Sequence, residues 1–123
     1  MYSQVLTDNL SYRSYTPQSP GALSNGTTLI EAQIETAVDI ISKLEKEGAK
    51  SIEARHEAEI EYKKFIEETA NYTLIPQTSS WWNGGNIPGK KAEGLTYVMG
   101  IDTYEKQCRD TMDGWKGWDV VSA

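Results

Sequence analysis

Apolar residues recur at helical spacing along residues 28–48. They fall on one face at steps of three and four positions, which is typical of an amphipathic helix. Thr28 and Glu31 match a capping box, and Gly48 offers the left-handed stop that often ends a helix. We therefore predict a first helix between Thr28 and Gly48, with an apolar stripe that other residues must cover. The stripe consists of Ile30, Ile34, Ala37, Val38, Ile41 and Leu44.

A second apolar face follows at the same spacing. It predicts a helix that starts near residues 54–56 and ends near Asn71. Glu59 and Lys63 form an i,i+4 pair on the opposite face. Such pairs add only about 0.2–0.5 kcal/mol to the stability of a helix, so we expect that face to be solvated and to carry no functional site. The side chains expected to face inward are Ala58, Tyr62, Phe65, Ile66, Thr69 and Ala70.

The C-terminal third combines extended stretches with one further helix. Residues 95–99 alternate and contain aromatic and β-branched side chains, which predicts a strand, and residues 118–121 predict a last strand paired with the first. Between them, Asp102 and Glu105 match a capping box at the start of a third helix. The inner face of this helix carries Tyr104, Cys108 and Met112.

These elements predict an α+β fold. It has two longer helices, a C-terminal helix, a small two-stranded β element and long ordered loops. Residues 1–26 contain two prolines and an Asn-Gly pair, so we expect an irregular N-terminal arm there. Residues 27–123 are expected to form a single domain, because a chain of 123 residues can bury one modest core without disulfides or metals.

Charge and composition exclude several classes of function. The net charge is −6 and no basic stripe is present, which excludes a nucleic-acid partner. The first twenty residues lack a long apolar run, so we expect neither a signal peptide nor a membrane span. The lone Cys108 cannot form an internal disulfide, which agrees with a reducing compartment and a cytoplasmic location.

Neither titratable candidate predicts a reactive centre. His56 lies between Glu53 and Glu59 on one helical face, but a metal site needs a further ligand segment that the sequence does not offer. Cys108 has no neighbouring base that would activate its thiol, and its position favours the core. We therefore expect a solvated histidine, a buried cysteine and no bound metal.

Four tryptophans are many for so short a chain. Trp115 and Trp118 are expected to fill the end of the core behind the third helix. Trp81 and Trp82 are expected to contact a ligand or a partner, because large apolar rings outside regular structure often line binding sites. Glycines at positions 84, 85 and 89 also permit backbone movement around them.

Residues 80–90 read S-W-x-x-G-x-N-I-P-G-K, and this pattern resembles the mobile loop near the C-terminus of Baeyer–Villiger flavin monooxygenases. In that family, the tryptophan at the position of Trp81 reaches the bound nicotinamide cofactor and helps to close the site. The resemblance covers residues 9–121, through short stretches in the same order and at similar spacing. They include residues 16–20, 24–26, 30–33, 52–54, 73–76 and 114–118.

The cofactor-binding motifs of that family are missing. Flavin and nicotinamide cofactors are held by strand-to-helix turns of the G-x-G-x-x-G type, and the sequence contains none. Thr16 stands where the family usually has a glycine as the chain passes the flavin, and a side chain there hinders close approach. The resemblance therefore implies the C-terminal part of a monooxygenase, detached and beginning at its own Met1, that binds no cofactor by itself.

Three functions are compatible with this resemblance. We expect first a cofactor-free protein of secondary metabolism that binds a hydrophobic small molecule and catalyses a non-redox cyclisation, cycloaddition or isomerisation. Orientation of the substrate alone can contribute about 7–11 kcal/mol to such a reaction. The alternatives are an accessory subunit or fragment of an FAD/NADPH-dependent Baeyer–Villiger monooxygenase, and a degenerate fragment without activity. A homodimer is expected, because a second copy would cover the stripe of the first helix.

The first hypothesis retains the old substrate pocket. Trp81 and Trp82 would form its apolar wall, and Tyr97 and Met99 would complete the lining from the adjacent strand. The catalytic hydrogen-bond donors would be Asn83 and Asn86, placed near a ligand carbonyl. A donor aimed at developing charge is typically worth about 2.7–4 kcal/mol.

Overall fold

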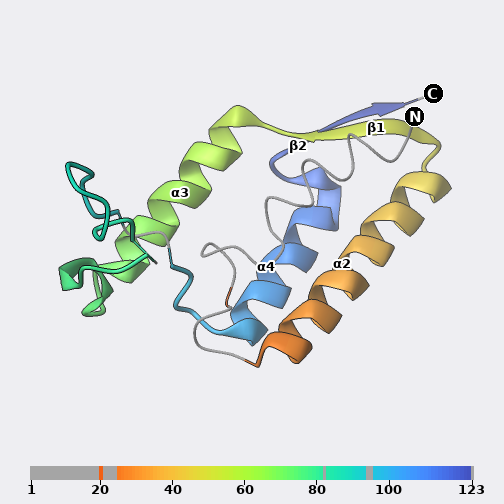
Figure 1. The fold of residues 1–123 in the computed structure, drawn as a ribbon. Helices are drawn as coiled ribbons and strands as arrows, with labels where there is room; N and C mark the ends of the chain where they lie inside the picture. The colour runs from red at the N-terminus through yellow and green to blue at the C-terminus, as the bar shows by residue number, and fades with distance from the viewer. Residues whose placement is uncertain (1–19, 21–24, 82, 94–95, 123) are drawn as a thin grey trace.

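The computed structural model describes Pro20 and residues 25–81, 83–93 and 96–122. These residues form three α-helices and a two-stranded antiparallel sheet, so the fold is α+β as predicted (Figure 1). α2 and α4 lie side by side, and β1 leads from the end of α2 to the start of α3. The elements are α2 (Gly26–Lys46), β1 (Ala49–Ala54), α3 (His56–Ala70), the 3-10 helix η1 (Ile75–Gln77), α4 (Ile101–Met112), the 3-10 helix η2 (Asp113–Trp115) and β2 (Trp118–Ser122).

α2 begins two residues before the predicted cap. The side chain of Asn25 accepts hydrogen bonds from the backbone amides of Thr27 (2.9 Å) and Thr28 (3.4 Å), so Asn25 is the N-cap and the capping box predicted at Thr28 is wrong. Asparagine is among the residues best suited to this position. The helix ends at Lys46, and Gly48 then takes a φ of +65°, which confirms the predicted stop.

Most of the predicted apolar stripe of α2 faces outward. Of its six members only Leu44 is buried, and the core instead takes the neighbouring row with Leu29, Ala32 and Ile40. The apolar arc of α2 is wide enough to offer two rows, and the spacing alone could not show which row faces the core. The exposed fractions are 46% for Ile30, 57% for Ile34, 55% for Val38 and 38% for Ile41.

α3 and α4 confirm their predicted inner faces. Ile66 of α3 is buried, and so are Tyr104 and Cys108 of α4. The start of α4 differs from the prediction, because Gly100 is the N-cap, with a φ of +82°, and no side chain caps the helix. Asp102 lies in the first turn of the helix and not at the cap, so the capping box predicted there is wrong.

β2 pairs with β1, which the sequence analysis did not identify as a strand. The antiparallel register places Ile52 opposite Val120, and Ile52 is the buried residue of β1. The other side chains of β1 are mostly exposed, so the strand has too little apolar character to be recognised from its sequence. Residues 96–99 form no strand in the structure, which contradicts the prediction there, and Leu95 lies outside the described residues.

The core consists of two separate clusters of buried side chains. The first joins α2, α3 and α4 and contains Leu29, Ile66, Tyr97, Tyr104 and Cys108. The second lies against the sheet and contains Ile40, Leu44, Ile52 and Trp118. Trp118 is only 5% exposed, which confirms its assignment to the core.

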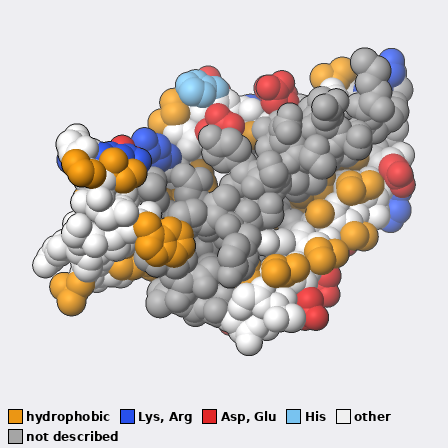
Figure 2. Space-filling model, viewed as in Figure 1, with side chains coloured by type: hydrophobic (Ala, Val, Ile, Leu, Met, Phe, Trp, Pro, Cys, Tyr) orange, Lys and Arg blue, Asp and Glu red, His pale blue; other side chains and the backbone are white. Residues whose placement is uncertain are grey.

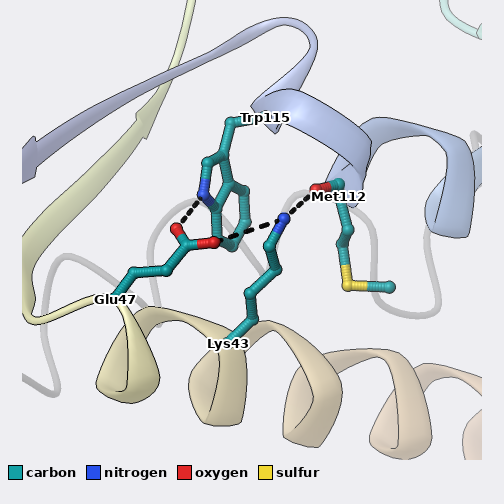
Figure 3. Close-up of polar contacts among 4 residues, drawn as sticks. All are labelled: Lys43, Glu47, Met112 and Trp115. Atoms are coloured by element: carbon teal, nitrogen blue, oxygen red, sulfur yellow. Dashed lines mark hydrogen bonds and ion pairs between the residues drawn. The ribbon is translucent and has the colours of Figure 1, made fainter.

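One polar cluster joins the C-terminal ends of α2 and α4 (Figure 3). Lys43 Nζ donates to the carbonyl oxygen of Met112, forms an ion pair with Glu47 at 3.5 Å and lies 4.7 Å from the centre of the Trp115 ring. The Trp115 Nε1 donates to Glu47 Oε2 at 2.6 Å. Cation–π and charge-assisted contacts therefore hold Trp115 in a structural role, as predicted, although its φ is +53°.

The N-terminal arm predicted over residues 1–26 is described only in part. Pro20 is buried, Asn25 caps α2, and Gly26 already belongs to that helix. The remainder, which includes Thr16, lies outside the described residues. None of the described helices combines the length and the apolar character that crossing a bilayer requires.

Candidate functional site: the loop that carries Trp81

The loop that follows η1 is built around the side chain of Asn83. Asn83 is fully buried, and its Nδ2 donates to the carbonyl oxygens of Ile75 and Thr78, both at 2.8 Å. Its Oδ1 accepts hydrogen bonds from the amides of Gly85 at 2.9 Å and Ser80 at 3.4 Å. A single amide thereby satisfies four backbone groups, because asparagine offers two donor hydrogens and two acceptor lone pairs.

The glycines of the loop are explained by its conformation. Gly84 has a φ of +72° and Gly89 a φ of +79°, in the left-handed region that strains other residues. Gly85 is packed tightly, since an added Cβ would lie 3.2 Å from the carbonyl oxygen of Thr78. The sequence analysis linked these glycines to movement, but turn geometry and close packing already require glycine at these positions.

Trp81 lies at the surface of this loop, with 65% of the residue exposed. Ile87 of the same loop is 49% exposed, and its carbonyl oxygen accepts a hydrogen bond from the Lys90 amide at 3.1 Å. Lys90 and Lys91 are both exposed. The loop therefore presents a large apolar ring and two positive charges on one hydrogen-bonded segment. Trp82 lies outside the described residues.

Tyr97 lies in the core. It is fully buried, its ring meets Tyr104 edge-on with 5.5 Å between ring centres, and its hydroxyl donates to Gln107 Oε1 at 2.8 Å. Burial, followed by the charge of Cys108, raises the pKa of Tyr97 to about 12. Met99, two residues further along, is 47% exposed.

The predicted site residues therefore occupy three different settings. Tyr97 is in the core, Asn83 is inside the loop, and Trp81, Asn86 and Met99 are exposed. Both amide hydrogens of Asn83 bind backbone carbonyls, which leaves no hydrogen for a ligand in this conformation. Sequence analysis missed this internal role, although the Asn83-Gly84 pair is a turn signal that points to it.

The sequence analysis did not single out Thr96 either. It is fully buried, and its hydroxyl has no hydrogen-bond partner among the residues that the structure describes. Leaving a polar group buried and unsatisfied costs about 1–3 kcal/mol. A threonine within an apolar and aromatic stretch gives no sequence signal for this arrangement, because the same pattern predicts a strand.

A small hollow of about 30 Å³ lies between α2 and α4. That volume is close to the space of one water molecule, so a metabolite does not fit there. The hollow is lined by Gln33, Thr36, Ile40, Tyr104, Cys108, Thr111 and Trp118.

His56 is at the exposed start of α3, with 80% of its side chain accessible and Nδ1 3.6 Å from Glu59. Over the ranges that the structure describes, no three His, Cys, Asp or Glu side chains converge as a metal site would require.

The strand-to-helix junction between β1 and α3 does not fit a dinucleotide. Arg55 occupies the N-cap position, but its side chain pairs with Asp119 (Nε to Oδ1, 2.8 Å) and does not cap α3, and neither element contains a glycine. The pyrophosphate of FAD or NADPH needs bare backbone at such a turn in order to approach the helix N-terminus. This junction therefore offers no site for such a cofactor.

Relatives of known function cover nearly the whole chain. This chain is 34% identical over 109 residues to cyclopentanone 1,2-monooxygenase from Comamonas sp. The aligned region covers 88% of this chain and 20% of that enzyme. It is also 33% identical over 112 residues to an FAD-binding monooxygenase of Aspergillus aculeatus. That alignment covers 91% of this chain and 19% of the relative. This chain therefore spans about a fifth of the length of the relatives it matches. No protein-family model matches it.

Solved structures of monooxygenases share the fold. Cyclohexanone monooxygenase from Rhodococcus sp. Phi1, bound to NADP+, superposes with a TM-score of 0.70 at 33% identity, over 77% of this chain and 18% of that one. A closed form of cyclohexanone monooxygenase gives the same TM-score at 39% identity, over 78% of this chain and 18% of that one.

These relatives contradict the function that the sequence analysis placed first. They are redox monooxygenases, whereas a cofactor-free cyclase, isomerase or Diels–Alder catalyst was expected. The missing cofactor motifs do not indicate new chemistry. A segment equal to a fifth of a flavoenzyme lacks those motifs for a simpler reason, since the remaining four fifths can carry them.

Proposed function

Because the homologues of this chain are Baeyer–Villiger-type flavin monooxygenases, we propose that it works as one part of an FAD- and NADPH-dependent monooxygenase. The other parts of the enzyme hold both cofactors. This chain supplies the loop of residues 80–91, which covers the nicotinamide cofactor once it is bound. Relatives named for cyclopentanone and cyclohexanone make a cyclic ketone the substrate class that we propose.

The observation that carries this proposal is the exposure of Trp81 on an ordered loop. The residue is 65% exposed, yet the backbone around it is held by the four hydrogen bonds of Asn83. An apolar ring presented in this way gains free energy when a flat partner such as a nicotinamide ring removes it from water. Because Asn83 orders the loop beforehand, little conformational entropy is lost on contact.

Two lysines give the same loop a preference for anions. Lys90 and Lys91 are exposed, and the chain carries an excess of acidic residues elsewhere. The end of the Lys90 side chain lies against Gly84, because a Cβ added to that glycine would be 3.1 Å from both Cε and Nζ of Lys90. Positive charge on the same loop as an exposed indole suits a ligand that joins an aromatic ring to phosphates.

When bound, NADPH would supply the hydride and FAD the oxygen chemistry of the reaction. This chain would position the cofactor and exclude water from it. A loop that closes over a cofactor orients it and limits side reactions with solvent. Trp81 would provide the contacting surface, and Asn83 would act as a positioning residue that keeps Trp81 in place.

A graft tests the proposal. The fifth of the Rhodococcus cyclohexanone monooxygenase that this chain matches is exchanged for the corresponding residues of this chain. We expect the graft to keep FAD through gel filtration, to oxidise NADPH and to oxygenate cyclohexanone. A graft that keeps FAD but forms no oxygenated product would contradict the proposal, because FAD retention shows that the host has folded.

A further inference from the structure

Two asparagines of the chain, Asn25 and Asn83, are followed directly by a glycine. An Asn-Gly pair is chemically reactive, because the bare glycine lets its amide nitrogen approach the side-chain amide of the asparagine. The attack closes a five-membered succinimide ring and releases ammonia. The fold places the two pairs in opposite settings, so they should react at different rates.

Asn25 is exposed at the start of α2. Its Oδ1 accepts the two cap bonds from Thr27 and Thr28, and neither bond uses the side-chain nitrogen that the reaction releases. Gly26 is the first residue of α2, and the first four amides of a helix have no partner within that helix. Figure 2 shows mainly uncharged atoms, drawn in white, at the lower edge of the molecule where α2 begins. Neither the attacking nor the leaving nitrogen is engaged by the helix or by its cap.

The folded conformation delays ring closure until the first turn of α2 opens. Asn25 has a ψ of 126°, which turns the Gly26 nitrogen away from the side chain, so the ring requires rotation about the Cα–C bond. The ends of helices open more readily than the interior of a protein. An opening here breaks the two cap bonds and the 3.0 Å bond from the Leu29 amide to the Asn25 carbonyl.

The surroundings of Asn83 protect it from the same reaction. Asn83 is fully buried, and its Nδ2, which would be the leaving nitrogen, donates to the carbonyl oxygens of Ile75 and Thr78. Its main chain is bound as well, through its amide to Ser80 at 3.3 Å and through its carbonyl to the Glu93 amide at 2.9 Å. Ring closure at Asn83 must break these bonds inside a loop, which is harder than opening the exposed end of a helix.

We propose that Asn25 is a site of spontaneous modification in the folded protein, where it deamidates to aspartate and isoaspartate while Asn83 stays intact. The Gly26 nitrogen forms a bond to Cγ of Asn25, and the C–N bond of the side-chain amide breaks. The proton lost by Gly26 leaves with the released nitrogen as ammonia. One water molecule then opens the ring at either carbonyl carbon and returns a proton to the Gly26 nitrogen. This inference is independent of the proposed function.

The two products should have opposite effects on α2. Aspartate keeps an oxygen at the cap and adds a negative charge at the helix N-terminus, where the first turn contains no acidic residue. Isoaspartate adds Cβ to the main chain and so displaces the carbonyl that binds the Leu29 amide. Leu29 is fully buried in the first core cluster, so the isoaspartate form should melt at a lower temperature.

Peptide mapping by mass spectrometry measures both sites in one sample. The chain is kept in mildly alkaline buffer, with or without urea, and is then cut by trypsin, which separates Asn25 in residues 14–43 from Asn83 in residues 65–90. In the folded chain, we expect conversion of amide to acid to be at least about tenfold faster at Asn25 than at Asn83. In urea, where the fold is lost, the two rates should converge to within about twofold.

Gly26→Ala is the control for the chemistry. The added methyl group hinders the attack, and alanine is the most favourable residue in a helix, so this variant should fold as before and keep residue 25 intact. Equal rates at Asn25 and Asn83 in the folded chain, whether both react or neither does, would overturn the proposal. So would a ratio that persists in urea, which would reflect the local sequence, or conversion that Gly26→Ala does not slow.

Discussion

Asn83 donates a 2.8 Å hydrogen bond from Nδ2 to the carbonyl oxygen of Ile75, at the start of η1. This bond ties the loop that carries Trp81 to the segment just after α3. The loop thus owes its shape to a buried amide, and any contact that Trp81 makes depends on a residue that does not face the ligand.

Replacing Asn83 should destabilise the protein far more than replacing Asn86. Asn83→Ala removes four partly buried hydrogen bonds that hold the loop backbone, so we expect a loss of at least about 1–3 kcal/mol in the free energy of unfolding. Asn86→Ala alters an exposed side chain and should change this free energy by less than about 0.5 kcal/mol. Urea unfolding of both variants measures the difference, and equal losses would refute the internal role of Asn83.

Replacing Trp118 should likewise destabilise the protein more than replacing Trp81. Trp118→Ala leaves a cavity in the cluster of Ile40, Leu44 and Ile52, and such a truncation costs about 3–5 kcal/mol. Trp81→Ala alters a residue that is 65% exposed, so the free energy of unfolding should fall much less. Thermal melts followed by circular dichroism decide the matter, and a similar loss for both would place Trp81 in the core.

Thr96→Val should leave the protein as stable as before or make it more stable. Valine has nearly the shape of threonine. It removes a buried hydroxyl that has no partner in the described part of the chain, and burying such a group costs about 1–3 kcal/mol. Thr73→Val is the control, because the Thr73 hydroxyl donates to Ala70 at 2.7 Å and accepts from the Ile75 amide at 3.2 Å. The control should destabilise. A clear loss of stability in Thr96→Val would reveal a hydrogen bond at Thr96.

Alkaline pH should weaken the fold through Tyr97. Its pKa rises from 10.0 to about 12 in the folded protein, chiefly because burial disfavours the phenolate. Above pH 10 the unfolded chain loses this proton while the folded chain keeps it. The stabilisation is therefore fully present below pH 10 and is lost as pH rises towards 12.

Unfolding in urea on either side of pH 10 checks this prediction. Tyr97→Phe should show a shallower fall of stability between pH 10 and 12 than the unaltered chain. Tyr72→Phe serves as the control, because Tyr72 is 92% exposed and its replacement should leave the fall unchanged. The same slope in both variants would show that Tyr97 does not drive the alkaline loss.

The sequence was informative where local pattern and packing agree. The bounds of α3, the stop at Gly48 and the inner face of α4 follow from spacing and from glycine geometry. It was misleading for α2, where two adjacent apolar rows compete and only the tertiary contacts with α4 select the row with Leu29 and Ile40.

The candidate site was also predicted only in part from the sequence. The resemblance to monooxygenases singled out Trp81, and the structure describes that residue as exposed on an ordered loop. The interior of the loop could not be predicted, because the four bonds of Asn83 join positions that are close only after folding. β1 was missed because its pairing with β2 stabilises it, and this pairing joins distant parts of the chain.

If Trp81 serves a nicotinamide cofactor within a flavin monooxygenase, its replacement should weaken the binding of NADPH. The most direct test is the KM for NADPH of the graft into the Rhodococcus enzyme, compared between Trp81→Ala and Tyr72→Ala, which truncate two exposed aromatic residues. We expect Trp81→Ala to raise this KM at least about tenfold, equivalent to about 1.4 kcal/mol, while FAD retention is unchanged and Tyr72→Ala has no effect. The same KM in both variants, with FAD retained, would contradict it.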